Sequence, residues 1–178
     1  MRGDSVVGIF PIKNGTEVVA RRAGPEDFEA IFEVIRDRHA DISRQINEHV
    51  DFTEEDKAIW LSEVQRPDAF LLLAELNNRI VGYTRLGWES HQDDGSIWVR
   101  GITVMVRYRR YGIGRAILLS ALWEAEHTLK LDSLFLCVAE PNFAKKLYES
   151  CGFQQVGKPF AGMWLKKPVR RFIMRKPF

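Results

Sequence analysis

The stretch VRYRRYGIGRAIL, residues 106–118, combines two glycines, four arginines and an apolar run. An extended apolar segment, residues 96–106, precedes it, and apolar residues recur at helical spacing after it. The pattern predicts a strand that ends near Val106 and a helix that starts near Gly112. The first N–H groups of a helix lack internal partners, and the helix dipole adds positive charge there. Glycines leave room for an anion and arginines donate to it, so we expect a phosphate-bearing ligand at this turn.

Two other phosphate-binding turns fit this stretch poorly. A dinucleotide-binding turn needs a third glycine, and Ile117 stands at that position. The lysine of a nucleotide-binding P-loop is also missing.

The rest of the chain alternates short strands and helices. Strands are predicted at residues 16–23, 70–76, 80–88, 96–106, 133–139, 153–160 and 169–176. Helices are predicted from Pro25, from Thr53 to about Arg66 before Pro67, from Gly112 to about Lys130, and over 143–152. Turns are predicted at Asn77-Asn78 and at residues 91–95. Gly101 predicts a bulge within the strand over residues 96–106. For residues 39–52 the sequence does not decide between a loop and a broken helix. The order favours a mixed α/β (α+β) fold around one sheet.

Composition limits the class of protein. The 178 residues suit one domain, and 26 basic against 24 acidic residues argue against a general nucleic-acid binder. No apolar run reaches the roughly 20 residues that a membrane-spanning helix needs. The start of the chain does not resemble a signal peptide. Cys137 and Cys151 lie among apolar neighbours without metal-ligand spacing, so we expect buried thiols, no metal site and a cytoplasmic location.

Two motifs together resemble one known family. The motif R-x-x-G-x-G, residues 109–114, follows a long strand and opens a helix. The motif A-x-x-L-Y-x-x-x-G-F, residues 144–153, spans the next helix and the start of a strand. In spacing and element order they resemble the acyl-CoA-binding motifs of the GCN5-related N-acetyltransferases (GNAT).

The resemblance covers roughly residues 16–176 and implies the overall fold. The whole chain, 1–178, would then form a single N-acetyltransferase-like domain with residues 1–15 as an N-terminal extension. The fold would be a central, mostly antiparallel mixed sheet of about seven strands, flanked by about four helices. The sheet would splay between its fourth and fifth strands.

The resemblance also implies the co-substrate, acetyl-CoA, and the residues that bind it. In the family the strand before the glycine motif pairs with the pantetheine arm, and the amides of the turn hold the pyrophosphate. The implied cofactor-binding residues are Ile102, Thr103, Val104, Arg109, Arg110, Tyr111, Gly112, Ile113, Gly114, Arg115 and Asn142.

The implied reaction is direct attack of an amine on the thioester, with Tyr148 as the general acid that protonates the leaving thiolate. Two features depart from the family pattern. Many members have asparagine seven residues before this tyrosine, where this chain has Pro141, and Asn142 lies six before it. Neither strand beside the splay carries the usual glutamate base, so the base is unassigned. A water chain or a group from 39–51, namely His39, Glu48 or His49, could take that role.

The amine substrate is not readable from these motifs. Six acidic residues gather between positions 41 and 56: Asp41, Glu48, Asp51, Glu54, Glu55 and Asp56. As an acidic wall they would favour a cationic amine such as a polyamine, an aminoglycoside or a lysine side chain; otherwise they are solvated surface charge.

Two other classes of function remain open beside the enzyme. The missing glutamate would suit a non-catalytic acyl-CoA sensor. The basic residues within 166–176 would suit a nucleic-acid binder with strongly salt-dependent affinity. Many family members form dimers, so a homodimer is one expected assembly.

Overall fold

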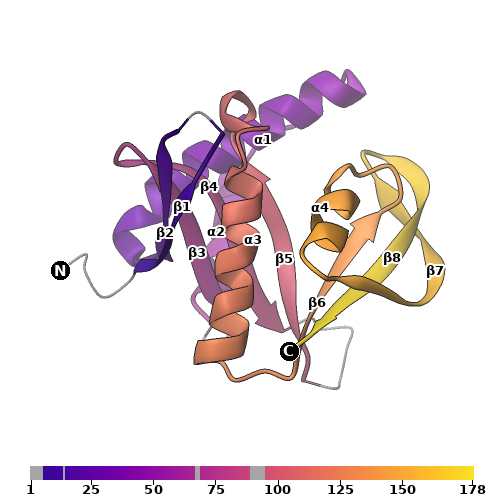
Figure 1. The fold of residues 1–178 in the computed structure, drawn as a ribbon. Coiled ribbons are helices and arrows are strands. Elements are labelled where there is room, and N and C mark those ends of the chain that lie inside the picture. The colour runs from indigo at the N-terminus through magenta and orange to yellow at the C-terminus, as the bar shows by residue number, and fades with distance from the viewer. Residues whose placement is uncertain (1–5, 14, 67–68, 89–94) are drawn as a thin grey trace.

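The computed structural model describes residues 6–13, 15–66, 69–88 and 95–178, and its fold is drawn in Figure 1. Most of the predicted turn over 91–95 lies outside the described residues, as does Pro67. Eight strands form the sheet: β1 (Val6–Pro11), β2 (Glu17–Arg22), β3 (Phe70–Leu76), β4 (Arg79–Trp88), β5 (Ile97–Val104), β6 (Ser133–Ala139), β7 (Gln154–Trp164) and β8 (Lys167–Pro177).

Four α-helices pack on this sheet: α1 (Phe28–Ile46), α2 (Glu54–Val64), α3 (Ile113–Trp123) and α4 (Ala144–Ser150). Short 3-10 turns precede α1 and α3, and a π-helical turn, Glu124–Thr128, continues α3. Thr53 caps α2 by accepting from the Asp56 N–H, and the Asp56 carboxylate accepts from the Thr53 N–H, which together form a capping box at the predicted helix start.

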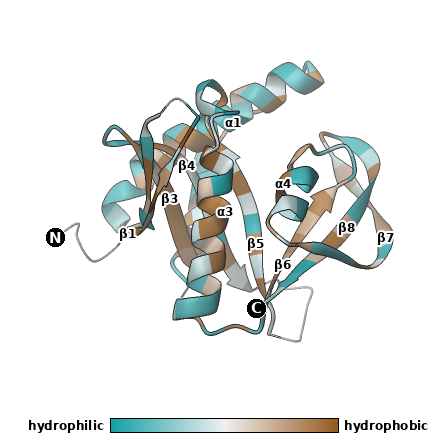
Figure 2. Ribbon diagram, viewed as in Figure 1, coloured by the Kyte–Doolittle hydropathy of each residue, from teal (hydrophilic) through white to brown (hydrophobic). Residues whose placement is uncertain are grey.

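The strand order is β1-β2-β3-β4-β5-β6-β8-β7, and only the β5–β6 pair is parallel. Helices α1 and α2 cover one face, where Ile31, Phe32 and Tyr83 share a core. Helices α3 and α4 cover the other face, where Leu118 and Tyr148 share a core with β6 and β8. Figure 2 shows β3 and β6 as mainly hydrophobic and the outer strand β7 as more hydrophilic, as expected of an edge strand.

The β3–β4 hairpin confirms the turn predicted at Asn77-Asn78. Both residues have positive φ, 50° and 60°, as the two central residues of a type I′ turn require. Asparagine tolerates this left-handed conformation better than most residues.

The structure differs from the sequence expectations at two places. The sheet has eight strands rather than about seven, because residues 6–11 of the expected N-terminal extension pair with β2 as β1. Residues 39–46 are neither a loop nor a broken helix but the last two turns of α1, which ends at Asn47 in a left-handed C-cap with φ 55°.

Candidate functional site

Strands β5 and β6 part soon after they pair. Their parallel register holds only at Trp98 with Phe135 and at Val99 with Leu136. Figure 1 shows the two strands diverging from this point. On its other edge β5 stays paired with β4, as far as Val104 opposite Gly82. The backbone of the predicted residues Ile102, Thr103 and Val104 therefore has one paired edge and one edge that faces the opening.

A bulge bends β5 at the start of the opening. Gly101 has φ +92°, and the register with β4 shifts between Thr84 and Leu86. The buried Thr84 hydroxyl donates to the Gly101 carbonyl at 2.7 Å. An extra residue in one strand increases its local bend, so the predicted bulge explains why β5 leaves β6 here.

The turn after β5 ends at a helix start without a side-chain cap. Arg110 has φ 72°, and Gly112, the N-cap of α3, has φ 104°. Glycine has no side chain that could accept from the first amides of α3, so the N–H groups of Ile113 and Gly114 are available to a ligand. The next amide, that of Arg115, donates to the Gly112 carbonyl at 3.0 Å. The structure thus has the helix start that the sequence predicted, and the binding of an anion there stays a prediction.

The Arg109 side chain contacts α1 and the end of β5. Its Nε donates to the Val104 carbonyl at 3.1 Å and its Nη1 to Asp41 at 2.6 Å. Burial works to raise the pKa of Asp41, but the hydrogen bond and charge of Arg109, helped by Arg44, outweigh it and lower that pKa. The guanidinium therefore fixes the turn to the helix, and its charge is already matched by a carboxylate.

A second aspartate on α1, Asp37, also holds the turn. Its carboxylate accepts from the Val106 N–H at 2.7 Å. Asp37 and Asp41 are four residues apart and therefore on one face of α1. Sequence reasoning missed this role, because nothing local connects α1 to a turn some seventy residues later.

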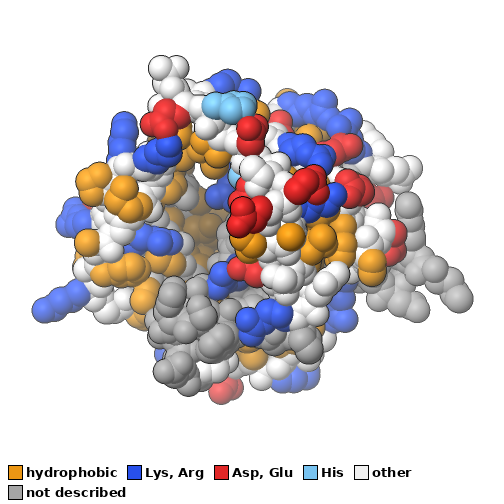
Figure 3. All heavy atoms as spheres, turned by 180° about the vertical axis from the view of Figure 1, so that it is seen from behind, with side chains coloured by type: hydrophobic (Ala, Val, Ile, Leu, Met, Phe, Trp, Pro, Cys, Tyr) orange, Lys and Arg blue, Asp and Glu red, His pale blue; other side chains and the backbone are white. Residues whose placement is uncertain are grey.

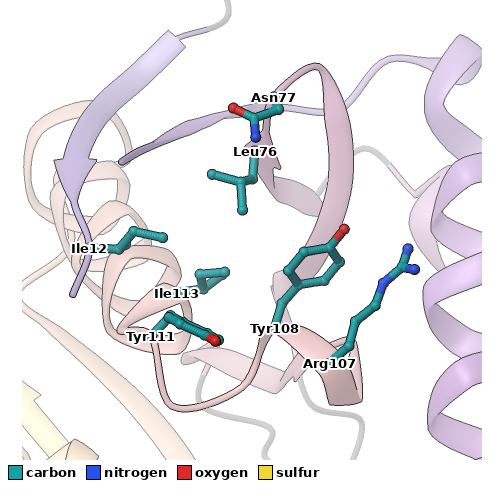
Figure 4. Close-up of a pocket in the computed structure, with 7 residues that line it drawn as sticks. All are labelled: Ile12, Leu76, Asn77, Arg107, Tyr108, Tyr111 and Ile113. Carbon is teal, nitrogen blue, oxygen red and sulfur yellow. The ribbon is translucent and has the colours of Figure 1, made fainter. Parts of the chain in front are cut away.

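A pocket of about 250 Å³ lies on the other side of the turn (Figure 4). Its lining comes from the β1–β2 and β3–β4 hairpins and from the turn itself: Ile12, Leu76, Asn77, Arg107, Tyr108, Tyr111 and Ile113. The Lys13 N–H donates to the Tyr111 carbonyl at 3.0 Å, so the β1–β2 hairpin also supports the turn. None of the lining residues belongs to β5 or β6, but Tyr111 and Ile113 are also among the predicted cofactor-binding residues.

Helix α4 brings the second motif to the opening. A Cβ on Gly114 would lie 3.8 Å from Leu147, 3.9 Å from Val104 and 4.0 Å from Ile102. Arg115 donates to the Ser150 hydroxyl at 2.8 Å and ties α3 to α4. The first turn of α3, the end of β5 and α4 therefore converge, as the two motifs predict.

Tyr148 lies in the core with only 7% of its surface exposed, and its ring meets Phe153 edge-on at 6.1 Å between centroids. Burial raises the pKa of the Tyr148 hydroxyl to about 12. The described residues contain one fully buried side-chain nitrogen or oxygen without a partner, and it belongs to Arg171. The Tyr148 hydroxyl has no hydrogen-bond partner among the described residues either, but it is not fully buried. Its oxygen therefore keeps some contact with solvent.

Asn142 lies just before α4, and its Oδ1 accepts from the N–H of Ala144, the first residue of the helix, at 2.9 Å. That bond uses the oxygen and leaves the amide NH₂ to donate elsewhere. Next to it, Glu140 pairs with Arg170, whose Nε is 3.0 Å away.

The three groups considered as bases all have partners. His39 Nδ1 lies 2.9 Å from the Asp51 carbonyl, and because a carbonyl only accepts, this nitrogen carries the proton. Glu48 pairs with Lys166, and the exposed His49 lies 2.9 Å from the Asp51 carboxylate. Of these groups, only His39 combines partial burial with a ring nitrogen, Nε2, left to accept a proton.

Two negative findings apply to the described part of the chain. No helix there is long and apolar enough to cross a membrane. No group of three or more His, Cys, Asp or Glu side chains within the described ranges is placed to hold a metal ion.

Comparison with protein families gives one match, to the model of the Acetyltransferase (GNAT) family over residues 29–153. Comparison with curated proteins gives no match.

Solved structures resemble the whole fold. An N-acetyltransferase from Staphylococcus aureus Mu50 has TM-score 0.70 at 20% identity, covering 90% of this chain and 98% of that one. The ribosomal-protein-alanine N-acetyltransferase of Brucella melitensis has TM-score 0.70 at 24% identity, covering 89% and 99%. The protein yncA of Salmonella typhimurium, solved with its cofactor acetyl-CoA, has TM-score 0.69 at 20% identity, covering 90% and 93%. At these identities the likeness is one of fold.

Proposed function

The chain belongs to the GNAT family of acetyltransferases, and from this premise we propose that it transfers an acetyl group from acetyl-CoA to a primary amine. One observation carries the proposal. Strands β5 and β6 part beside the uncapped start of α3, which leaves a strand edge and a set of helix amides facing one opening. A similar fold, that of yncA, has been solved with acetyl-CoA, which supports the same co-substrate here.

Each part of acetyl-CoA has a matching partner in this proposal. Its pantetheine arm is peptide-like and pairs with the open edge of β5 along Ile102, Thr103 and Val104. The amides from Arg110 to Gly114, including those of Tyr111, Gly112 and Ile113, hold the pyrophosphate. The Arg115 N–H already donates to the Gly112 carbonyl at 3.0 Å. Arg109 acts indirectly, because its contacts with Asp41 and Val104 set the shape of the turn. The free NH₂ of Asn142 donates to the co-substrate from the α4 side.

We assign the general acid to Tyr148. The amine nitrogen attacks the thioester carbonyl carbon, the C–S bond breaks, and the thiolate takes the proton of the Tyr148 hydroxyl. A raised pKa keeps that hydroxyl protonated at neutral pH, so the proton is present when the thiolate forms. The amine loses its own proton to a base, for which His39 is our first candidate.

A thiol-release assay tests the proposal. Acetyl-CoA is mixed with a panel of primary amines, and the wild-type chain is compared with Tyr148→Phe, which keeps the ring and removes the proton donor. We expect amine-dependent thiol release in the wild type and a fall in kcat of about 10²- to 10⁴-fold in the variant, the usual range for a lost general acid. Calorimetric binding of acetyl-CoA without thiol release for any amine would instead support the acyl-CoA sensor.

The location and the base are also proposals. Cys137 and Cys151 are half-buried rather than fully buried and form no disulfide, which supports a reducing, cytoplasmic location. Alanine variants of His39, Glu48 and His49 that leave the pH–rate profile unchanged would exclude all three as the base.

A further inference from the structure

The opening has a second face, on the side away from α3 and α4. Figure 3 views the molecule from behind Figure 1 and shows a hollow between the β6–β8 lobe and the rest of the molecule. Side chains along a strand alternate between faces. Leu134, Leu136 and Val138 pack into the core with α4, so Phe135, Cys137 and Ala139 lie on the side of the hollow. An amine that attacks a thioester held along β5 can enter from this side.

Most of the acidic residues between positions 41 and 56 have ion-pair or hydrogen-bond partners. Asp41 pairs with Arg109 and Arg44, Glu48 with Lys166, and Asp51 with His49. Asp56 accepts the capping hydrogen bonds of Thr53. Of the six acids between 41 and 56, only Glu54 and Glu55 have no such contact among the described residues, and both are exposed at the start of α2. These residues therefore do not form an open acidic wall for a polyamine.

Arg171 carries the opposite charge on this face. It stands opposite Ala139 in the β6–β8 register, so its side chain lies on the side of the hollow. Its Nε is buried and has no hydrogen-bond partner, and its guanidinium forms no ion pair among the described residues. Buried polar groups in proteins almost always have a partner, so this donor needs an explanation.

The packing of β7 holds the Arg171 side chain in place. A Cβ on Gly162 would lie 2.4 Å from Arg171 Cδ, so the arginine stem occupies space that only glycine leaves free. A stem fixed in this way presents its guanidinium in a defined direction. Such a preorganised fork of N–H donors matches a carboxylate, which can accept two parallel hydrogen bonds.

We propose that the acceptor amine carries a carboxylate and that Arg171 binds this carboxylate. The inference rests on the proposed acetyltransferase function and names its substrate class: an amino acid or a related amino carboxylate. Arg171 lies opposite the last residue of β6, at the end where β5 and β6 are furthest apart. The carboxylate anchors the substrate there, and the amine reaches across the hollow toward β5.

Matched pairs of amines in the thiol-release assay test the proposal. L-Methionine is compared with L-methioninamide, and L-glutamate with L-glutamine, while spermidine serves as a cationic amine without a carboxylate. We expect the preferred acceptor to lose activity when its carboxylate becomes an amide. In Arg171→Gln, the KM for that acceptor should rise about 10- to 100-fold, the range for a lost hydrogen bond to a charged group. The KM for acetyl-CoA should stay unchanged.

Arg175 provides the matched control. It lies on the same face of β8, four residues along, with its guanidinium 5.7 Å from the Phe135 ring centroid. Arg175→Gln removes the same charge and should leave the acceptor KM unchanged. Arg171→Lys keeps the charge and most of the stem but loses the planar fork, so we expect a smaller rise in KM. This variant also provides a folded protein if Arg171→Gln is unstable.

The outcomes distinguish a failure of the proposed acetyltransferase function from a failure of the role proposed for Arg171. Turnover of spermidine with no preference for carboxylates, or equal effects of the Arg171 and Arg175 variants, would leave the acetyltransferase in place and overturn the role of Arg171. Absence of thiol release with every amine, despite acetyl-CoA binding, would overturn both the function and the inference drawn from it.

Discussion

Replacing Asp41 with asparagine should weaken the binding of acetyl-CoA although Asp41 lies on α1, outside both motifs. The variant keeps the shape of the side chain and removes the charge that pairs with Arg109 at 2.6 Å. A hydrogen bond to a charged group contributes about 1.5–3 kcal/mol to stability. The Arg109 side chain is 38% exposed while that of Asp41 is 14% exposed, so screening reduces the expected loss to about 1–2 kcal/mol.

Two measurements check this prediction. For a chain of this size, about 1–2 kcal/mol corresponds to a fall in Tm of about 2–8 °C. The KM for acetyl-CoA should rise several-fold with little change in kcat, because the turn that binds the pyrophosphate loses its anchor. Asp51→Asn is the control, since Asp51 and its partner His49 are both well exposed and such pairs contribute about 0–1 kcal/mol.

The contribution of the Asp41–Arg109 ion pair to stability depends on pH. The pKa of Asp41 is lowered in the folded state, so its contribution is present above the unfolded pKa of about 3.9 and is lost as the pH falls through the lower, folded pKa. The stability difference between wild type and Asp41→Asn should therefore shrink below about pH 4. An unchanged Tm and KM at neutral pH, or equal changes in the Asp51 control, would refute a positioning role for Asp41.

Two further predictions concern the opening. Gly112→Ala should cost about 1–2 kcal/mol of stability and weaken calorimetric acetyl-CoA binding, because φ is 104° although the nearest atom to a new Cβ is 3.9 Å away. Gly157→Ala, also at positive φ with open space around it, should cost a similar amount and leave acetyl-CoA affinity unchanged; an equal loss of affinity would speak against the helix start as the phosphate site. With Tyr148 as the acid and its pKa near 12, kcat should show no fall from its deprotonation between pH 8 and 10, whereas a fall near pH 10 that disappears in Tyr148→Phe would contradict its buried environment.

Local sequence predicted most elements because their signals lie within a few residues. The β3–β4 hairpin follows from Asn77-Asn78, which tolerate the two positive φ angles of its turn. The start of α3 follows from Gly112 and the apolar spacing after it. Strand β1 escaped prediction because it is a short edge strand whose stability comes from pairing with β2.

The sequence by itself determined the family motifs, the glycine helix start and the place of Tyr148, since these depend on residue spacing and backbone geometry. Tertiary structure alone decided how the charged residues are used. Arg109 belongs to the glycine motif, yet it pairs with a carboxylate 68 residues earlier in the chain. Asp41 and Glu48 pair with cations far away in the chain, while the Arg171 Nε has no partner among the described residues. The partner of a charged side chain depends on which elements pack together, and no local pattern encodes that arrangement.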